Sequence, residues 1–469
     1  MKNFKLGAYA LLAGAMMTVS CSDDDNVVDS PDGNDFVGAV YAMTNGDGQI
    51  DGFVQGPNVI VTYGRSADGA LTPIGPVNTG GNGGDFDGPE GLDPLISAYA
   101  ITKTRDNEFI LAVNAGSNTI SALPINEDFS LGSPVTIGTS AEGPNSIDSY
   151  PAPDTMTGVN SLVLVTNITR SEFLNGGEPM HRGTLDAFWL LDDGSFQSAG
   201  ASVDLDNRPS CVHISPDGAY AIVASINAGA AGLDIGATDG TGTGSTGVGN
   251  QDEVVLFGIN GGTLTRLDGA TSTLRGNDDL RNRPSAIGSQ IVEGADGNLY
   301  AVVTEAREFQ YNGAPPAFNE LQDGSVSTWR IEGDELVDVD LDVASGENNT
   351  GRTACWLDFT ADESTFFVSN AIEAGLASYS FDNGNIELLN ATAAQGIGAP
   401  AQVPDVGGPF DVTQGWIDMW ISDDGQFLYQ LYGLDGTIGI FGINGQTLTP
   451  LGEESNNLPE TNTQGIVAI

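Results

Sequence analysis

The sequence predicts an all-β fold, a seven-bladed β-propeller of four-stranded blades, and three observations lead to this prediction. A hairpin with a tight turn of Gly, Asn or Asp residues recurs seven times along the chain. A second turn, with the pattern Ser/Thr-x-Asp-Gly, precedes most of these hairpins. The repeats lack helical periodicity. Four-stranded units of roughly 50 to 70 residues, repeated without helices, are typical of a propeller.

The seven hairpin turns are rich in residues that tolerate a positive φ angle, which tight turns require. They are Ala67-Asp68-Gly69, Asn126-Glu127-Asp128, Asp192-Asp193-Gly194, Asn260-Gly261-Gly262, Glu332-Gly333-Asp334, Asp382-Asn383-Gly384 and Asn444-Gly445-Gln446. Each is flanked by short apolar or Leu- and Thr-rich runs. We therefore expect seven outer hairpins, one for each blade.

The second turn type supplies the inner half of each repeat. It is clearest at Ser215-Pro216-Asp217-Gly218, Thr360-Ala361-Asp362-Glu363 and Ser422-Asp423-Asp424-Gly425, with weaker copies at 295–297 and 104–107. An apolar strand follows each copy, over 220–225, 366–370, 427–431, 299–304 and 109–114. The repeat is therefore strand A, turn, strand B, loop, strand C, tight turn, strand D. Packing between neighbouring blades buries both faces of a sheet, which explains the apolar B and C strands.

The two ends of the repeat region predict how the ring closes. The first hairpin lacks an A strand, since 38–44 is B-like, 58–64 is C-like and 71–77 is D-like. Residues 465–469 form one unpaired apolar strand. We expect this strand to supply the inner strand of blade 1, so that the propeller spans residues 36–469.

The N-terminal region has the features of an export signal. Lys2 and Lys5 precede an apolar stretch over 6–19 that is too short to cross a bilayer. Cys21 follows directly, and the segment resembles a bacterial lipoprotein signal in which Cys21 is lipidated. Residues 22–25 resemble the acidic tags of surface lipoproteins. We expect a signal peptide over 1–20, an acidic flexible tether over 21–35, and a lipid anchor in the outer membrane with the protein on the cell surface. The alternatives are a periplasm-facing anchor, or a cleaved secretory signal in which Cys21 is incidental.

The amino-acid composition excludes some classes of binding partner. The chain has 15 basic and 63 acidic residues, for a formal net charge of −48, and 40% hydrophobic residues, enough for a sizeable core. Such a surface repels phosphate backbones and anionic headgroups, so we expect no nucleic-acid partner and membrane contact only through the lipid anchor. We also expect a monomer. Cys211 and Cys355 fall on inner strands one whole blade apart, which predicts two buried, unbridged thiols.

Four segments carry a resemblance to a known family: 208–220, 298–305, 262–265 and 464–469. The pattern over 37–469 resembles the lactonase-type seven-bladed propellers. That family includes bacterial 6-phosphogluconolactonases and the 3-carboxy-cis,cis-muconate lactonising enzymes, also labelled 3-carboxymuconate cyclases. The family commonly has a His after Pro or Pro-Arg ahead of an A strand. This chain has Arg208-Pro209-Ser210 and Arg283-Pro284-Ser285 instead. The resemblance therefore implies the fold more strongly than the chemistry.

Candidate binding residues gather on the face where the B–C and D–A loops open. Strand B repeatedly ends in a polar residue, which predicts a broken ring of amides and one carboxylate around the channel mouth: Asn45, Asn114, Asn167, Asn227, Asn370 and Glu305. The alternative is that these residues only cap strand ends. Arg208, Arg283 and Arg352 precede neighbouring A strands, and Arg307 begins the long loop of blade 5. Guanidinium groups bind carboxylates bidentately, so these residues predict an anion pocket, unless they bridge acidic loops.

Lactone hydrolysis requires an activated water, a donor for the oxyanion and anchors for the substrate carboxylate. Glu305 matches the Glu that ends the corresponding strand in the family, which implies that it orients a water or a hydroxyl group. His181 lies in a long loop and is the best general-base candidate by residue type. No cofactor is expected with certainty, and the Asp-rich loop over 234–252 makes Ca²⁺ a candidate.

Two functions remain open at this stage. The first is a lactonase or lactonising enzyme acting on a sugar acid or an aromatic-derived acid at the channel mouth. The second is a non-catalytic surface propeller that binds a glycan, a peptide or a protein through its long loops. The expected ligand is a small anionic or carbohydrate-derived molecule in the first case and a surface partner in the second.

Overall fold

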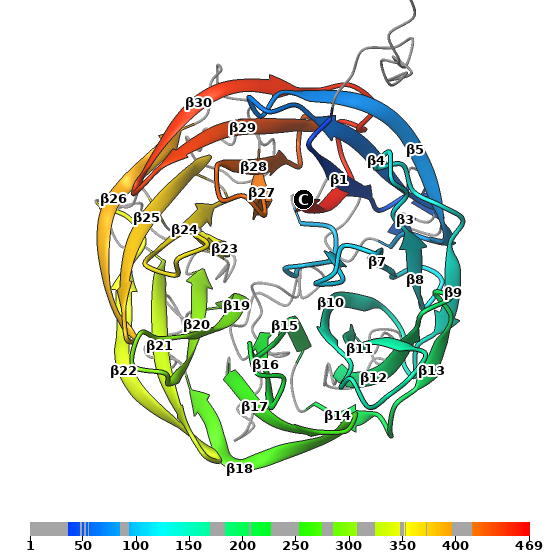
Figure 1. The fold of residues 1–469 in the computed structure, drawn as a ribbon. Coiled ribbons are helices and arrows are strands. Elements are labelled where there is room, and N and C mark those ends of the chain that lie inside the picture. Colours follow the sequence, from blue (N-terminus) through cyan, green and yellow to red (C-terminus); the bar gives the residue numbers. More distant parts are fainter. Residues whose placement is uncertain are drawn as a thin grey trace, which may run out of the picture. The chain divides into compact units, whose positions relative to one another are not determined.

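The computed structural model confirms the seven-bladed propeller (Figure 1). The structure describes residues 36–46, 49–50, 53–54, 56–84, 93–168, 183–205, 208–226, 253–273, 285–306, 324–347, 351, 353–371, 373–395 and 415–469. All of them belong to one compact unit that spans Phe36–Ile469. They form antiparallel strands and turns and contain no helix, and therefore none long and apolar enough to cross a membrane.

Each blade is a sheet whose first-named strand faces the channel. Blade 1 has β31 (Thr463–Ala468), β1 (Gly38–Thr44), β4 (Pro57–Arg65) and β5 (Leu71–Asn82). Blade 2 has β6 (Ile101–Lys103), β7 (Phe109–Asn114), β8 (Thr119–Pro124) and β9 (Val135–Gly138). Blade 3 has β10 (Pro144–Pro151), β11 (Val159–Ile168) and β12 (Gly183–Leu191), with its outer strand divided into β13 (Phe196–Ser198) and β14 (Val203–Asp204).

The remaining blades follow the same order from the channel outward. Blade 4 has β15 (Arg208–Ile214), β16 (Tyr220–Ile226), β17 (Glu253–Asn260) and β18 (Thr263–Thr273). Blade 5 has β19 (Ser285–Glu293), β20 (Leu299–Ala306), β21 (Ser325–Glu332) and β22 (Glu335–Ala344). Blade 6 has β23 (Ala354–Phe359), β24 (Thr365–Asn370), β25 (Gly375–Asp382) and β26 (Asn385–Gln395). Blade 7 has β27 (Trp416–Ile421), β28 (Phe427–Tyr432), β29 (Thr437–Asn444) and β30 (Thr447–Glu454). A separate pair, β2 (Gln49–Ile50) and β3 (Phe53–Val54), lies between β1 and β4 in the chain.

The Ser/Thr-x-Asp turns explain why strands A and B meet where the sequence predicts. Ser215 donates its hydroxyl to Asp217 at 2.6 Å, and Thr360 and Ser422 make the same bond to Asp362 and Asp424. The Asp carboxylate also accepts a backbone N–H two residues further on, for example that of Ala219 at 3.0 Å. These bonds join residues close together in the chain, so they stabilise the turn without any long-range contact.

The ring closes as predicted, with one inner strand from the C-terminal segment. Strand β31 pairs antiparallel with β1, and Val40 lies opposite Ala468. The strand covers Thr463–Ala468 rather than 465–469, because Thr44 also finds a partner in Thr463. The Arg65 guanidinium donates to the Ile469 carbonyl at 3.2 Å and holds the last residue against blade 1.

Both inner-strand cysteines are buried and are not joined by a disulfide, as predicted. Cys211 lies on β15 of blade 4 and Cys355 on β23 of blade 6, so blade 5 stands between them. Burial raises the pKa of Cys211 to about 12, which keeps it protonated at neutral pH.

The two faces of the ring are unequal. We call the face with the B–C and D–A loops the mouth face and the face with the A–B and C–D turns the turn face. Every internal segment outside the described residues is a connection on the mouth face. The A–B and C–D turns on the opposite face all lie within the described residues.

Candidate functional site

The segment 93–100, which precedes β6, runs across the channel and closes it. We call it the plug. In Figure 1 the cyan chain ahead of β7 enters the middle of the ring. Leu95, Ser97, Ala98 and Ala100 are fully buried there. Hydrogen bonds join the plug to all seven blades. The sequence repeat does not predict these bonds, because the plug occurs only once in the chain.

Tyr99 is the plug residue that contacts the most blades. Its hydroxyl donates to the Leu357 carbonyl of blade 6 at 2.5 Å and accepts from the Gln290 amide of blade 5 at 3.0 Å. Its backbone N–H donates to Asp418 of blade 7 at 3.3 Å, and its carbonyl accepts from Ile147 of blade 3. One residue therefore ties four blades together at the channel axis.

The other plug residues contact the remaining blades. Gln464 of blade 1 donates to the Ser97 carbonyl at 2.6 Å and accepts from the Leu95 N–H at 2.7 Å. Arg208 of blade 4 donates to the Leu95 carbonyl at 3.4 Å. The Ala100 carbonyl accepts from Val113 of blade 2. The plug therefore forms a floor beneath the mouth face.

Two plug residues have an unusual backbone conformation. Ile96 has a φ of 50° and Tyr99 a φ of 59°. A positive φ is rare for a β-branched residue such as Ile and is strained. Strained residues of this kind persist only where the surrounding contacts fix them, and they concentrate at functional sites. The contacts of the plug with seven blades meet that condition.

Polar side chains close every seam between adjacent inner strands. We call them the seam clips. An inner strand is the edge of its sheet, so its channel-facing N–H groups lack a strand partner. Around the ring, five clips bond directly to the next blade: Asp148, His213, Gln290, Asp358 and Asp418. The other two act through the plug: Gln464 of blade 1 bonds to it, and Ser97 within it donates to the Asn145 carbonyl of blade 3.

The carboxylate clips show the bond most clearly. Asp148 accepts from the Ile214 N–H at 2.7 Å, Asp358 from the Ile421 N–H at 2.7 Å, and Asp418 from the Gly465 N–H at 3.0 Å. Burial raises the pKa of Asp358 to about 6 and that of Asp418 to about 7. Both groups therefore titrate below or near neutral pH, inside the ring.

His213 is the clip between blades 4 and 5. Its Nδ1 accepts from the Ile291 N–H at 3.2 Å, so the hydrogen of the neutral ring lies on Nε2. Burial lowers the pKa of His213, which favours this neutral form. Asp148, His213, Gln290 and Asp358 are polar residues inside A strands, and this is the sequence signal for the clips that repeat comparison missed.

Arg208 and Glu305 lie at the mouth ends of strands in neighbouring blades. Arg208 begins β15 and is 5% exposed, and its guanidinium reaches the plug. Glu305 lies near the end of β20 and is buried, and its carboxylate accepts a hydrogen bond from the Ser325 hydroxyl. The structure therefore brings a buried cation and a buried carboxylate to the same face.

The described asparagines at the strand ends are all buried. Asn114 donates to Ser121 at 2.7 Å and accepts from Thr79 of blade 1 at 2.6 Å, so it bridges two blades. Asn167 donates to Asp186 at 3.0 Å within its own blade, and Asn370 accepts from Ser345 at 3.1 Å. Asn45 donates its backbone N–H to the Asn462 carbonyl. Asn114 and Asn167 therefore bond to strand residues, and Asn370 bonds to Ser345, the residue that follows β22.

Several predicted site residues lie outside the described residues: Asn227, His181, Arg283, Arg352, Arg307 and the lipidation candidate Cys21. The Asp-rich loop over 234–252, the Ca²⁺ candidate, does so too. Within the described ranges, no three His, Cys, Asp or Glu side chains come together as metal ligands.

Several solved structures have a fold similar to that of this protein. A "putative 6-phosphogluconolactonase" from Bacteroides fragilis superposes with a TM-score of 0.54 at 15% identity, over 95% of this chain and 100% of that one. The periplasmic gluconolactonase of Pseudomonas aeruginosa gives 0.52 at 14% identity, over 92% and 99%. A hypothetical selenium-binding protein from Sulfolobus tokodaii gives 0.55 at 11% identity, over 92% and 93%.

These likenesses define the class: a seven-bladed propeller with the fold of the gluconolactonases. At such low identity they establish the fold alone, and the selenium-binding protein has it too. No family model matches the sequence, and no curated protein matches it either. The fold alone therefore does not define the function.

Proposed function

We propose that the protein is an exported lactonase that hydrolyses the lactone of a sugar acid or an aromatic-derived acid at its mouth face. The observation that carries this proposal is the pair of buried residues Arg208 and Glu305 at the mouth ends of strands in neighbouring blades, with Arg208 bonded to the plug. The lactonase-like fold and the signal-like N-terminus support it. We further propose lipidation at Cys21 and anchoring in the outer membrane, with the mouth face available to substrate.

The proposed chemistry uses one cation and one carboxylate. Arg208 would bind the substrate carboxylate or the oxyanion, because a guanidinium group offers several donors in a fixed plane. Glu305 would orient the attacking water or a substrate hydroxyl through its buried carboxylate. His181 would take the proton of that water, and Arg283, Arg307 and Arg352 would complete the anion pocket. The plug forms the floor, so substrate would enter and product would leave on the same side.

The experiment is a pH-stat assay of the full chain against a panel of aldonolactones and muconolactones, with Glu305→Gln and His181→Ala alongside. Acid release above the spontaneous rate, lost in either variant while the fold is kept, would support the proposal. Folded protein that releases no acid from any lactone would contradict it.

A second candidate, a non-catalytic binding propeller, is favoured by one observation. The side chains of Asn114, Asn167 and Asn370 are hydrogen-bonded to other residues of the propeller, so they offer less to a substrate than a free amide ring would. In this case the long loops of the mouth face would bind a glycan, a peptide or a protein partner.

A binding measurement separates the two candidates. The triple variant Arg208→Ala, Arg283→Ala and Arg352→Ala should lose aldonate binding in calorimetry and keep its fold if the arginines form an anion site. Aldonate binding that is unchanged by the triple substitution would return these residues to a structural role and favour the binding propeller.

A further inference from the structure

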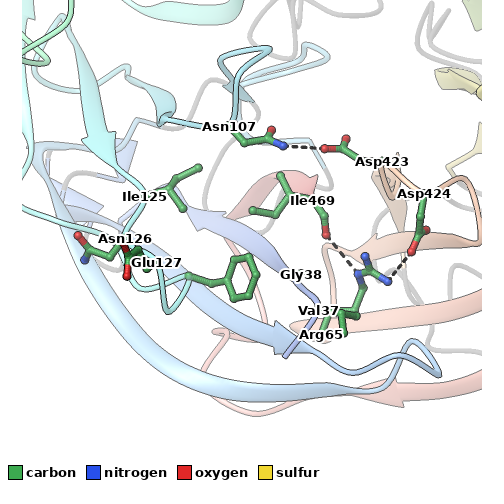
Figure 2. Close-up of a pocket in the computed structure, with 11 residues that line it drawn as sticks. Val37, Gly38, Arg65, Asn107, Ile125, Asn126, Glu127, Asp423, Asp424 and Ile469 are labelled. Carbon is green, nitrogen blue, oxygen red and sulfur yellow. Dashed lines mark hydrogen bonds and ion pairs between the residues drawn. The ribbon is translucent and has the colours of Figure 1, made fainter. Parts of the chain in front are cut away.

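The turn face has a pocket where the ring closes, and topology explains it. The other six blades each have an A–B turn on this face, but in blade 1 the inner strand β31 and the second strand β1 come from opposite ends of the propeller. No A–B turn joins them. The gap is a pocket of about 530 Å³ between the turns of blades 2 and 7. We call it the closure notch (Figure 2).

The floor of the closure notch is apolar. Ile469, Phe129 and Ile125 line it together with Val37. Val37 is 53% exposed, one of the few large hydrophobic side chains in the described residues with that much exposure. The Tyr41 hydroxyl donates to the Phe129 carbonyl at 3.0 Å, which fixes the blade 2 turn as one wall. The pocket volume falls in the range of ligand sites.

The rim of the closure notch is acidic. Asp424 is paired with Arg65 at 2.9 Å, and Asp423 with Lys103 at 2.7 Å. Asn107 also donates to Asp423, as Figure 2 shows. Glu127 is exposed, and no bond to its carboxylate occurs in the part of the chain that the structure describes. The three carboxylates of Asp423, Asp424 and Glu127 outnumber the two cations that pair with the aspartates. The side chains of the rim therefore carry one net negative charge.

We propose that the closure notch docks a basic segment of a partner protein, with a Lys or Arg side chain at Glu127 and an aliphatic neighbour on Val37 and Phe129. The negative rim is complementary to the basic side chain of this segment, and the apolar floor to its aliphatic neighbour. An acidic segment would be repelled by the rim. The net charge of −48 attracts such a partner from a distance. This site is on the face opposite to the proposed lactonase site and does not depend on it.

The probe is a fluorescein-labelled tetrapeptide of alternating lysine and leucine, followed by fluorescence anisotropy with the full chain at low salt. The test variants are Glu127→Gln and Val37→Ser. Their matched controls are Asp334→Asn, at the exposed C–D turn of blade 5, and Leu451→Ser, which is 50% exposed on β30. All four positions are exposed, so thermal midpoints should stay the same.

We expect each test variant to weaken peptide binding by about two- to fivefold, since an exposed ion pair and a partly exposed apolar contact contribute modestly. The two controls should bind as the native protein does, and a glutamate–leucine peptide should not bind. The proposal is overturned if the controls lose as much affinity as the test variants, which would indicate diffuse attraction to an acidic surface. Absence of any peptide binding would overturn it too.

Discussion

At the scale of single residues, Asp418 is the clip that joins three parts of the ring. It accepts from Tyr99 in the plug and from Gly465 in β31, and it lies on the inner strand of blade 7. It is 2% exposed, and the loss of water raises its pKa to about 7 despite these bonds. Asp358 has the same role between blades 6 and 7, with a pKa of about 6.

These pKa values predict how stability depends on pH. A carboxyl group with a raised pKa binds its proton more tightly in the folded state, so the proton stabilises the fold. That stabilisation is lost as pH rises from the unfolded value of 3.8 to about 7 for Asp418. Each pKa unit corresponds to about 1.4 kcal/mol, so the loss amounts to a few kcal/mol.

Asp418→Asn does not titrate, so its free energy of unfolding should fall less steeply over this pH range than that of the native protein. Urea unfolding at several pH values measures the difference, with the exposed Asp154→Asn as the control. Parallel curves for the native protein and Asp418→Asn would show that this clip does not carry the pH dependence.

At the scale of elements, the plug acts as a common anchor for the blades. Tyr99→Phe removes the bonds of one hydroxyl to Leu357 and Gln290 and leaves the Leu357 carbonyl with only the longer bond from the Gln290 amide, at 3.5 Å. We expect a loss of about 1 to 3 kcal/mol in the free energy of unfolding. Tyr220→Phe is the matched control, since no hydrogen bond of the Tyr220 hydroxyl occurs among the described residues. Equal effects of the two substitutions would mean that the Tyr99 hydroxyl does not anchor the plug.

The closing strand β31 is the second element on which the ring depends. Deleting residues 465–469 exposes the edge of β1 and removes the partners of Asp418 and Arg65. Val467 and Ala468 are fully buried, so their loss also opens the core. We expect cooperative thermal unfolding to collapse in calorimetry. A truncated protein that melts at the native midpoint would contradict closure by this strand.

At the scale of the whole molecule, the repeat predicted the ring and its closure because both follow from local turns and alternating strands. The turn pairs such as Ser215 and Asp217 need only neighbours in the chain, and β7 runs from Phe109 to Asn114 as expected. The plug occurs once, so repeat comparison could not find it. The clips were missed because each acts on the next blade, and the closure notch because it results from a missing turn.

The candidate site could be predicted only in part. The sequence placed Arg208 and Glu305 on the mouth face, where the structure has them. It could not show that Asn114 and Asn370 are already hydrogen-bonded, because their partners are far away in the sequence repeat: Thr79 lies on β5 of blade 1 and Ser345 follows β22 of blade 5. Sequence position alone does not tell a strand-end amide that binds ligand from one that ties blades together.

The most direct test of lactone chemistry at the mouth compares kcat/KM of Arg208→Gln and Arg330→Gln with that of the native protein on the best aldonolactone. Arg330 lies on β21, is half-exposed and pairs with Glu332, so it is the control. Thermal midpoints must show both variants folded. We predict a fall of about 10- to 100-fold for Arg208→Gln, the loss of a charge-assisted bond, and no change for Arg330→Gln. A folded Arg208→Gln variant with native kcat/KM, or a native protein without activity on any lactone, would contradict the account.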